Sequence, residues 1–136
     1  MNMTTKELSL GDAAKAVEWL NARMKTHGVE CGFPAGVLPR TGLACYEGER
    51  LRAVAFLYLE KSSSIAVCGW CIADPENSMR VSAEAVHALI YAMPDFARSK
   101  GATILLSTFG NRGINRIAAK AGFITGEKAI NMYMAL

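Results

Sequence analysis

The sequence has 136 residues, of which 51% are hydrophobic and 20% are charged, and its formal net charge is +3. This length accommodates one domain with a hydrophobic core, and the composition excludes a disordered chain. Lysines and arginines stand singly, mostly beside acidic residues, so the charge pattern argues against a nucleic-acid surface. We therefore predict one globular domain over residues 1–136 and no nucleic-acid partner.

The N-terminal residues and the cysteines bear on the cellular location. Met1–Glu7 lacks the basic-then-apolar order of a signal peptide. No apolar stretch approaches the roughly 20 residues that span a bilayer, so we expect no membrane partner. A cytoplasmic, reducing compartment follows, in which the four cysteines are free thiols.

The first predicted element is a helix over Gly11–Lys25, where apolar residues recur at helical spacing. Asp12 is the expected N-cap, because its carboxylate can accept a hydrogen bond from the first turn. Gly28 is expected to end this helix. The stretch 29–41 is rich in glycine and proline and is predicted to be a loop.

A run of strands comes next. Leu43–Tyr46 and Leu51–Leu59 are predicted to form a hairpin around the turn Glu47–Glu49. A second turn, Lys61–Ser64, leads into Ile65–Ile72. This last stretch is apolar on both faces, which is typical of a strand at the centre of a sheet that is covered on both sides.

A long helix is predicted from about Val81 to Ser99, and Lys100 with Gly101 is expected to end it. Pro94 lies inside this pattern. Proline removes a backbone hydrogen bond and clashes with the preceding turn, so we expect it to kink or split the helix near Met93.

Three elements complete the chain: a short buried strand at Thr103–Ser107, a helix at Gly113–Ala121, and one or two final strands within Phe123–Leu136. The order is helix, loop, two or three antiparallel strands, long helix, strand, helix and strands. Strands and helices in this order predict an α/β (α+β) domain.

The run Asn111–Phe123 follows the pattern Asn-x-x-Ala-x-x-Leu-Tyr-x-x-x-Gly-Phe. The positions in register are Asn111, Ile114, Ile117, Gly122 and Phe123. With the element order, this run resembles the GCN5-related N-acetyltransferase (GNAT) superfamily, and it is similar to divergent members carried by bacteriophages. The resemblance covers nearly the whole chain in order, and its motifs lie within Arg80–Phe123. It implies a central mixed sheet flanked by helices, and acetyl-CoA as cosubstrate.

A second motif of that family is Arg/Gln-x-x-Gly-x-Gly/Ala, which binds the pyrophosphate of acyl-CoA at the start of the long helix. The segment in register keeps the arginine and the final small residue, while Ala83 replaces the first glycine. The resemblance makes these residues cofactor-binding: Arg80, Val81, Ser82, Ala83, Glu84 and Ala85. A helix N-terminus suits this role because its N–H groups and dipole attract anions. The alternative is an ordinary alanine-rich helix start.

The strand before this motif contains Gly69, and a glycine inside a strand often marks a bulge or a close backbone approach. The resemblance implies that the strand binds the pantetheine arm of acetyl-CoA through backbone groups of Cys71, Ile72 and Ala73. Asn111 is assigned to the same cofactor site. The loop Asp74–Met79 looks about two residues longer than is usual in the family.

The four cysteines could also indicate a redox pair or a zinc site, and we predict neither. Cys68 and Cys71 form a C-x-x-C pair, but a redox pair needs its first thiol at a helix N-terminus. Here a strand runs through the pair, and residues three apart on a strand face opposite sides. A zinc site from these two with Cys31 and Cys45 has only one correctly spaced pair, so we predict no metal.

The resemblance implies transfer of an acetyl group to an amine. A tyrosine on the last helix commonly protonates the leaving thiolate in this family, and Ala118 stands in its place. Loss of acid assistance costs roughly 10²–10⁴-fold. The catalytic residues and the general base therefore remain unassigned, although Glu47, Glu49 and Glu60 lie near the central strands.

Two hypotheses about function remain open. One is an acetyl-CoA-dependent N-acetyltransferase for an unidentified amine. The other is a catalytically inactive protein with the same fold that acts in binding or assembly. The sequence also leaves open whether the chain forms a homodimer.

Overall fold

The computed structural model describes residues 2–29, 32–109, 112–127, 132, 134 and 136. Within these residues the chain forms strands and helices in the order β1 (Met3–Glu7), α1 (Leu10–Thr26), β2 (Gly42–Glu47), β3 (Arg50–Leu59), β4 (Ile65–Ala73), α2 (Met79–Ser99), β5 (Ile104–Ser107) and α3 (Arg112–Lys120). No helix among the described residues is long and apolar enough to cross a bilayer.

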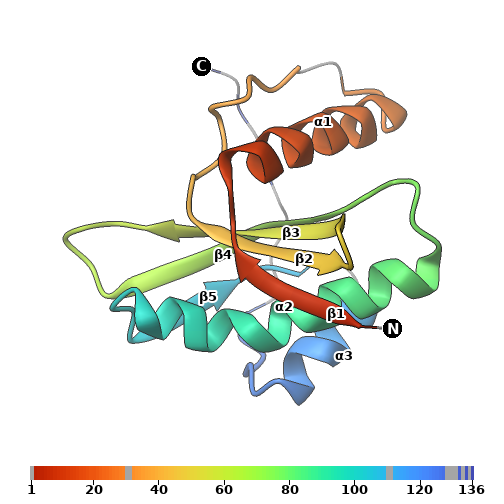
Figure 1. Cartoon of the computed structure of the whole chain (residues 1–136). Helices are drawn as coiled ribbons and strands as arrows, with labels where there is room; N and C mark the ends of the chain where they lie inside the picture. The colour runs from red at the N-terminus through yellow and green to blue at the C-terminus, as the bar shows by residue number, and fades with distance from the viewer. Residues whose placement is uncertain (1, 30–31, 110–111, 128–131, 133, 135) are drawn as a thin grey trace.

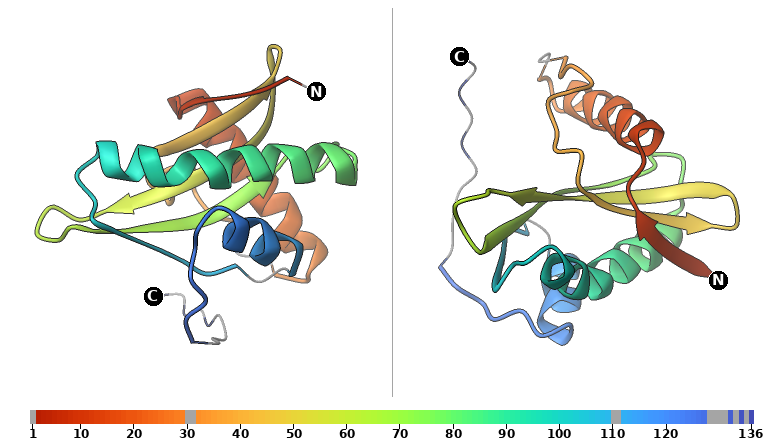
Figure 2. Two further views of the ribbon diagram at one scale, coloured as in Figure 1. Left: turned by 90° about the horizontal axis from the view of Figure 1, so that it is seen from below. Right: turned by 60° about the vertical axis from the view of Figure 1, so that its left-hand side comes forward.

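The strands form one mixed sheet in the order β1-β2-β3-β4-β5. Neighbouring strands are antiparallel except β4 and β5, which are parallel and are connected through α2. Helix α1 covers one face of the sheet, while α2 and α3 lie on the other (Figures 1 and 2). The sheet therefore carries one hydrophobic cluster under α1 and a second under α2.

Helix α1 begins at Leu10, after an N-cap at Ser9 rather than the predicted Asp12. Ser9 Oγ accepts a hydrogen bond from the Asp12 amide at 3.1 Å, and the Asp12 carboxylate accepts one from the Ser9 amide at 3.3 Å. This reciprocal arrangement is a capping box, which satisfies two amide groups at once. Gly28 ends the helix as predicted, with φ of 76°.

Helix α2 runs through Pro94 without being divided, so the predicted split near Met93 is wrong. The side chains of Leu89, Met93 and Ala97 are buried against the sheet on both sides of the proline. Burial of a long apolar face offsets the one backbone hydrogen bond that proline removes. Gly101, with φ of 91°, follows the end of the helix as predicted.

The strands differ from the predictions in four respects. β1 was not predicted, because Met3–Glu7 is mostly polar and forms an edge strand against β2. The central strand is β3 and not β4. β5 is present as predicted but is not fully buried, and with β4 it exposes one face of the sheet. Residues 123–127 form no strand, and most of the remaining C-terminal segment lies outside the described residues.

The exposed face of β4 and β5 lies on the α1 side of the sheet, beyond the end of that helix. Its apolar side chains are between 40% and 51% exposed: Ile65, Val67, Ile104 and Leu106. Tyr58 of the neighbouring β3 is 39% exposed beside Val67. The prediction that β4 is covered on both sides is therefore wrong for its first half. A helix covers only the part of a sheet on which it packs, and α1 packs on the second half of β4, at Trp70 and Ile72.

Candidate functional site

β4 contains a bulge at its middle. Val54 of β3 pairs with Ile72 and Phe56 pairs with Gly69, so Ala55 lies opposite two residues of β4. One of these two, Trp70, has φ of 54°, which is the left-handed region that side chains other than glycine rarely adopt. The bulge predicted from Gly69 is confirmed, and it lies directly after the glycine.

The bulge divides β4 into two halves with different neighbours. The paired half, Ile65–Cys68, pairs with β3 on one side and with β5 on the other. The open half, Trp70–Ala73, pairs with β3, and no described strand pairs with its other side. Pairing with β5 stops at Cys68 and Ser107, where Ser107 Oγ donates a hydrogen bond to the Cys68 carbonyl at 2.9 Å. β5 ends here, and no described strand pairs with this side of β4 beyond it; we call the place where the β4–β5 pairing ends, together with the open half of β4, the fork.

The direction of the backbone groups in the open half follows from one contact. The Asp74 amide donates to the Arg52 carbonyl of β3 at 2.9 Å. Because backbone groups alternate along a strand, those of Ile72 also point towards β3, and those of Cys71 and Ala73 point away from it. Two of the three predicted lining residues, Cys71 and Ala73, therefore direct their N–H and C=O groups to the side of β4 that faces away from β3. The Ile72 side chain is 2% exposed and packs under α1.

The start of α2 lies beyond the carboxyl end of this open half. Ser78 is the N-cap: its Oγ accepts from the Val81 amide at 3.2 Å, and its carbonyl accepts from the Ser82 amide at 3.0 Å. The amides without an acceptor in the helix are therefore those of Ser78, Met79 and Arg80. These amides begin two residues before the predicted segment Arg80–Ala85 and overlap it at Arg80.

The side chains of that predicted segment face different environments. Arg80 is 79% exposed, and its Nε donates to Glu84 Oε1 at 3.1 Å one turn later. Ala83 is exposed, while Ala85 is fully buried in the cluster under α2. Arg80 is the one member that offers both a cationic side chain and a helix-terminal amide.

The fork and the adjoining helix start can be compared with known proteins. No protein-family model and no curated protein sequence matches the chain. Solved structures do match. YncA of Salmonella typhimurium, an assigned acetyltransferase described with its cofactor acetyl-CoA, has a TM-score of 0.71 at 14% identity, over 92% of this chain and 81% of that one.

Two further structures extend the comparison. The ribosomal-protein-alanine N-acetyltransferase of Brucella melitensis biovar Abortus 2308 gives a TM-score of 0.67 at 13% identity, covering 98% of this chain and 100% of that one. An aminoglycoside acetyltransferase from a soil metagenome, in complex with sisomicin, gives 0.63 at 12% identity, covering 98% and 96%. The chain has the GNAT acetyltransferase fold. At these identities the likeness concerns the fold alone.

In this GNAT fold, the position expected to hold a tyrosine is buried. Ala118 of α3 is 3% exposed and packs against Val86 and Ile90 of α2. Cys71, from the open half of β4, packs against the same cluster. The space at residue 118 is therefore filled by the contact between the two helices, and no larger side chain fits there without displacing one of them.

On the α1 face, the bulge directs Trp70 towards the loop that follows α1. Its ring meets the edge of Phe33 at 6.2 Å between centroids. Asn21 holds Phe33 through two hydrogen bonds to its backbone, at 2.7 and 2.9 Å. The Trp70 indole donates to the hydroxyl of Tyr58, whose pKa is nevertheless raised, mainly by burial. We call Phe33, Tyr58 and Trp70 the aromatic cluster.

Sequence reasoning missed the aromatic cluster. The signal that could have indicated it is a large aromatic residue directly after a glycine within an apolar strand. A bulge re-aims side chains, so the residue that follows such a glycine can leave the alternation of the strand. The partner residue in the loop has no such signal, because only the tertiary fold brings the loop to the strand.

Of the two cysteines near the fork, Cys68 is buried and Cys71 is partly buried. Burial raises the pKa of Cys68 to about 11 and that of Cys71 to about 12. Both thiols pack on the α2 side of the sheet, so the prediction that they face opposite sides is wrong. The bulge adds a residue between them and thereby returns them to one face. A raised pKa leaves both as unreactive thiols, which does not fit a redox pair.

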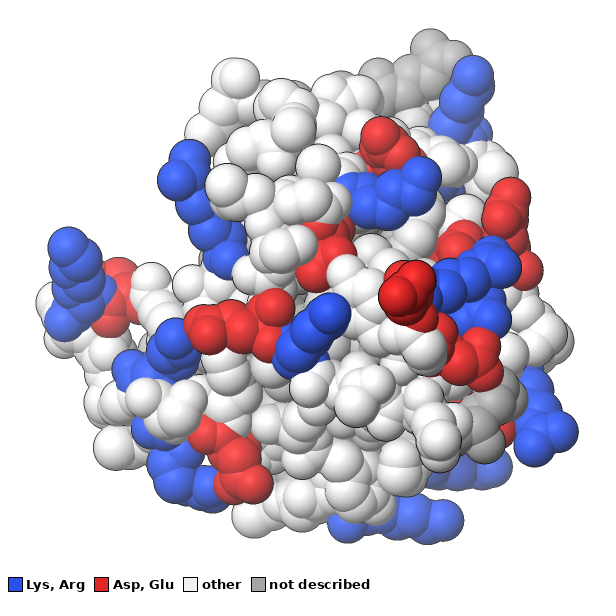
Figure 3. All heavy atoms as spheres, in the orientation of Figure 1, with Lys and Arg blue, Asp and Glu red and all other residues white. Residues whose placement is uncertain are grey.

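The remaining predicted site residues are placed as follows. Cys45, Cys68 and Cys71 are free thiols, whereas Cys31 and Asn111 lie outside the described residues. No group of three or more metal-binding side chains occurs among the residues that the structure describes. On the face shown in Figure 3, basic and acidic side chains alternate, and no extended patch of one sign is visible.

Proposed function

We propose that the protein is an acetyl-CoA-dependent N-acetyltransferase that acetylates an amine. The observation that carries the proposal is the fork between β4 and β5, next to the start of α2. The fork leaves one edge of the partly buried open half of β4 without a described partner strand, and backbone polar groups in such a place are normally paired. A ligand with amide groups would satisfy it.

The residues at the fork suit the parts of acetyl-CoA. The N–H and C=O groups of Cys71 and Ala73 would pair with the amides of the pantetheine arm. The helix-terminal amides of Ser78, Met79 and Arg80 would bind the pyrophosphate, assisted by the Arg80 side chain, which would exchange its exposed contact with Glu84 for the phosphate. Asn111, together with the other residues of the predicted motif, remains part of this proposal.

The chemistry asked of the chain is modest. Acetyl-CoA supplies the thioester, and a neutral amine attacks its carbonyl carbon as the C–S bond breaks. Holding the two reactants together accounts for much of the rate in such a reaction. Because residue 118 is alanine, proton transfer to the departing thiolate falls to another group or to water. The expected enzyme is therefore slower than one that carries the tyrosine.

The acceptor amine would approach on the α1 side, where the aromatic cluster lies next to the bulge. The proteins with this fold include one described with an aminoglycoside and one named for a ribosomal-protein alanine. These acceptors have little in common, so the fold does not define the amine for this chain. A cytoplasmic location, a homodimer and the similarity to phage proteins also remain predictions.

Calorimetric titration with acetyl-CoA tests the proposal. We expect binding at micromolar concentrations, and Arg80→Glu should weaken it by placing a negative charge at the pyrophosphate. The matched control is Arg98→Glu, because Arg98 lies on the same helix, is exposed and also pairs with a nearby carboxylate. The absence of binding by the unaltered protein at millimolar acetyl-CoA would exclude the enzyme.

The alternative is a catalytically inactive protein of this fold that acts in binding or assembly, and Ala118 is the observation that speaks for it. Release of free CoA thiol in the presence of a panel of primary amines separates the two. Turnover with any amine above the rate of spontaneous hydrolysis supports the acetyltransferase. Tight binding with no turnover across the panel supports the alternative.

A further inference from the structure

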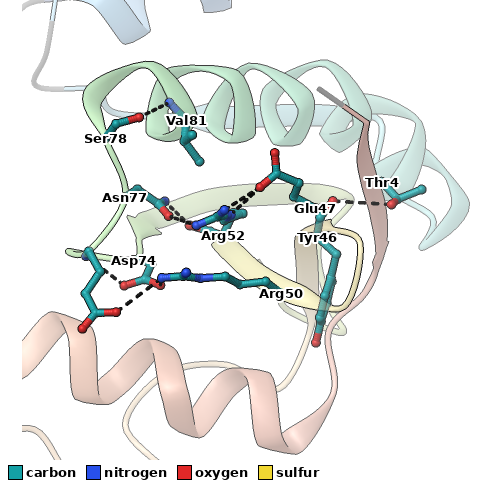
Figure 4. Close-up of polar contacts among 10 residues, drawn as sticks. Thr4, Tyr46, Glu47, Arg50, Arg52, Asp74, Asn77, Ser78 and Val81 are labelled. Carbon is teal, nitrogen blue, oxygen red and sulfur yellow. Dashed lines mark hydrogen bonds and ion pairs between the residues drawn. The ribbon is translucent and has the colours of Figure 1, made fainter.

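The loop between β4 and α2, residues 74–78, is attached to β3 by Arg52 (Figure 4). Arg52 Nη1 donates to Asn77 Oδ1 at 3.0 Å, and Asn77 Nδ2 donates back to the Arg52 carbonyl at 2.8 Å. The Asp74 amide donates to the same carbonyl at 2.9 Å. Both ends of the loop are thus bonded to one residue of β3.

Arg52 is itself held by Glu47 of β2. Its Nε donates to Glu47 Oε1 at 3.0 Å, and Nη2 forms an ion pair with the same oxygen. The side chains are only 15% and 26% exposed, so water weakens this pair less than it weakens a surface pair. The planar guanidinium can bind the carboxylate on one side and the Asn77 amide on the other.

A backbone irregularity directs Arg52 towards this position. Cys45 of β2 pairs with Ala53, and the next residue, Tyr46, pairs with Leu51. Arg52 therefore has no residue opposite it in the backbone pairing with β2. It is the extra residue of a second bulge in the sheet. Bulges occur often beside active sites, where they turn a side chain in a direction that a regular strand does not allow.

The loop leads directly into the start of α2. Asn77 precedes Ser78, whose cap contacts fix Val81 and Ser82 in the first turn. A displacement of Asn77 would therefore move the amides of Ser78, Met79 and Arg80. These are the groups assigned above to the pyrophosphate.

We propose that Arg52 and Asn77 are positioning residues for the nucleotide end of the acyl-CoA site. They hold the β4–α2 loop, and with it the helix-terminal amides, at a fixed distance from the open half of β4. This inference rests on the proposed function for its ligand. It adds two residues that no motif in the sequence indicates, and it gives a role to a loop about two residues longer than is usual.

A second arginine provides a matched comparison. Arg50, two residues earlier on β3, contacts the same loop through Asp74 at 3.4 Å and Glu76 at 3.3 Å. Its side chain is 51% exposed, and those of its partners Asp74 and Glu76 are 11% and 82% exposed. Ion pairs of a half-exposed arginine contribute little, because solvent and salt screen them. Arg50 should therefore matter far less than Arg52, although both reach the same loop.

The experiment uses Asn77→Ala, which removes the two hydrogen bonds between Asn77 and Arg52 and leaves the Arg52–Glu47 pair intact. Asn77→Asp and Arg50→Ala are the comparison variants. Hydrogen exchange of the unliganded proteins reports the order of residues 74–82, and calorimetry reports the dissociation constant for acetyl-CoA. For Asn77→Ala we expect faster exchange confined to residues 74–82, and affinity weakened about tenfold. Asn77→Asp keeps the acceptor for Arg52 and should lose less. Arg50→Ala should stay within about twofold.

Each result decides one point. Affinity of Asn77→Ala within twofold of the unaltered protein overturns the inference, and so does an equal loss in Arg50→Ala. Unaltered exchange at residues 74–82 in Asn77→Ala overturns it independently of any ligand. If the unaltered protein does not bind acetyl-CoA at all, the proposed function fails instead, and the exchange data alone decide whether the attachment orders the loop.

Discussion

The two halves of β4 differ although they belong to one strand. The paired half, Ile65–Cys68, has a neighbour on each side and forms part of the sheet core. The open half, Trp70–Ala73, has β3 on one side and no described strand on the other. The change occurs at one residue, Trp70, whose left-handed backbone costs about 1–3 kcal/mol. The strained residue lies at the boundary between the half of β4 that pairs on both sides and the half that is a candidate for ligand binding.

The largest expected effect is on the paired half. Cys68→Asp should lower the free energy of unfolding by about 3–5 kcal/mol, because it places an unpaired carboxylate in a site that is 5% exposed. Urea denaturation followed by circular dichroism measures it. The control is Val67→Asp, since Val67 faces the other side and is 40% exposed, and it should cost about 1 kcal/mol or less. Equal losses would contradict the assignment of faces.

The next effect concerns the helix contact beside the open half. Ala118→Tyr introduces the residue that the family pattern expects, but the site is 3% exposed and filled by Val86 and Ile90. We expect overpacking to reduce stability by about 1–3 kcal/mol without a gain in acetyl transfer. Thermal unfolding measures the loss, with the exposed Ala119→Tyr as control. A stable variant with a faster rate would show that the helices can separate to admit the tyrosine.

A smaller effect is expected at the junction of the two halves. A methyl group on Gly69 would lie 3.1 Å from the Tyr58 ring, which is a side chain that can shift. Gly69→Ala should therefore cost about 1 kcal/mol. In a Tyr58→Ala background the cost should disappear, which a double-mutant cycle of urea midpoints would detect. An unchanged cost in that background would place the conflict in the backbone and not in the ring.

A further effect is a pH dependence from the thiols of Cys68 and Cys71. Their pKa is raised in the folded protein, to about 11 for Cys68 and about 12 for Cys71, from 9.0. The folded state therefore keeps protons that the unfolded chain releases, so stability is full below pH 9 and falls as pH rises towards 11–12. Urea midpoints at pH 8 and pH 10 should show this fall. Replacing both thiols by alanine should reduce the slope, and an unchanged slope would assign it to other groups.

Much of the fold could be predicted from the sequence because the signals were local. Helical periodicity located α1 and α2 to within about two residues, and Gly28 and Gly101 end them as expected. Gly69 indicated a bulge that is present. These features depend on neighbours in the chain, which is why they can be read from it. β1 could not be predicted, because its polar residues are ordered only by pairing with β2.

The candidate site was predicted less completely. Cys71 and Ala73 were predicted to belong to the strand that binds the pantetheine arm. In the structure their backbone groups point away from β3. The helix-terminal amides lie at Ser78, Met79 and Arg80, because Ser78 caps the helix earlier than periodicity indicated, while cofactor binding by Arg80–Ala85 stays a prediction. Arg52 and Phe33 were not singled out. Each acts through a residue at least 12 positions away, and no local pattern encodes such a pairing.

The sequence by itself determined most of the elements, their order and the resemblance that suggested an acetyltransferase, since periodicity, turn residues and short motifs are local properties. Only the tertiary structure decided where β4 and β5 part, which amides at the start of α2 lack partners, and how Arg52 attaches the loop between them. The reason is physical. Open strand edges and buried ion pairs arise from contacts between segments far apart in the chain, and their geometry is fixed only when the sheet and helices pack together.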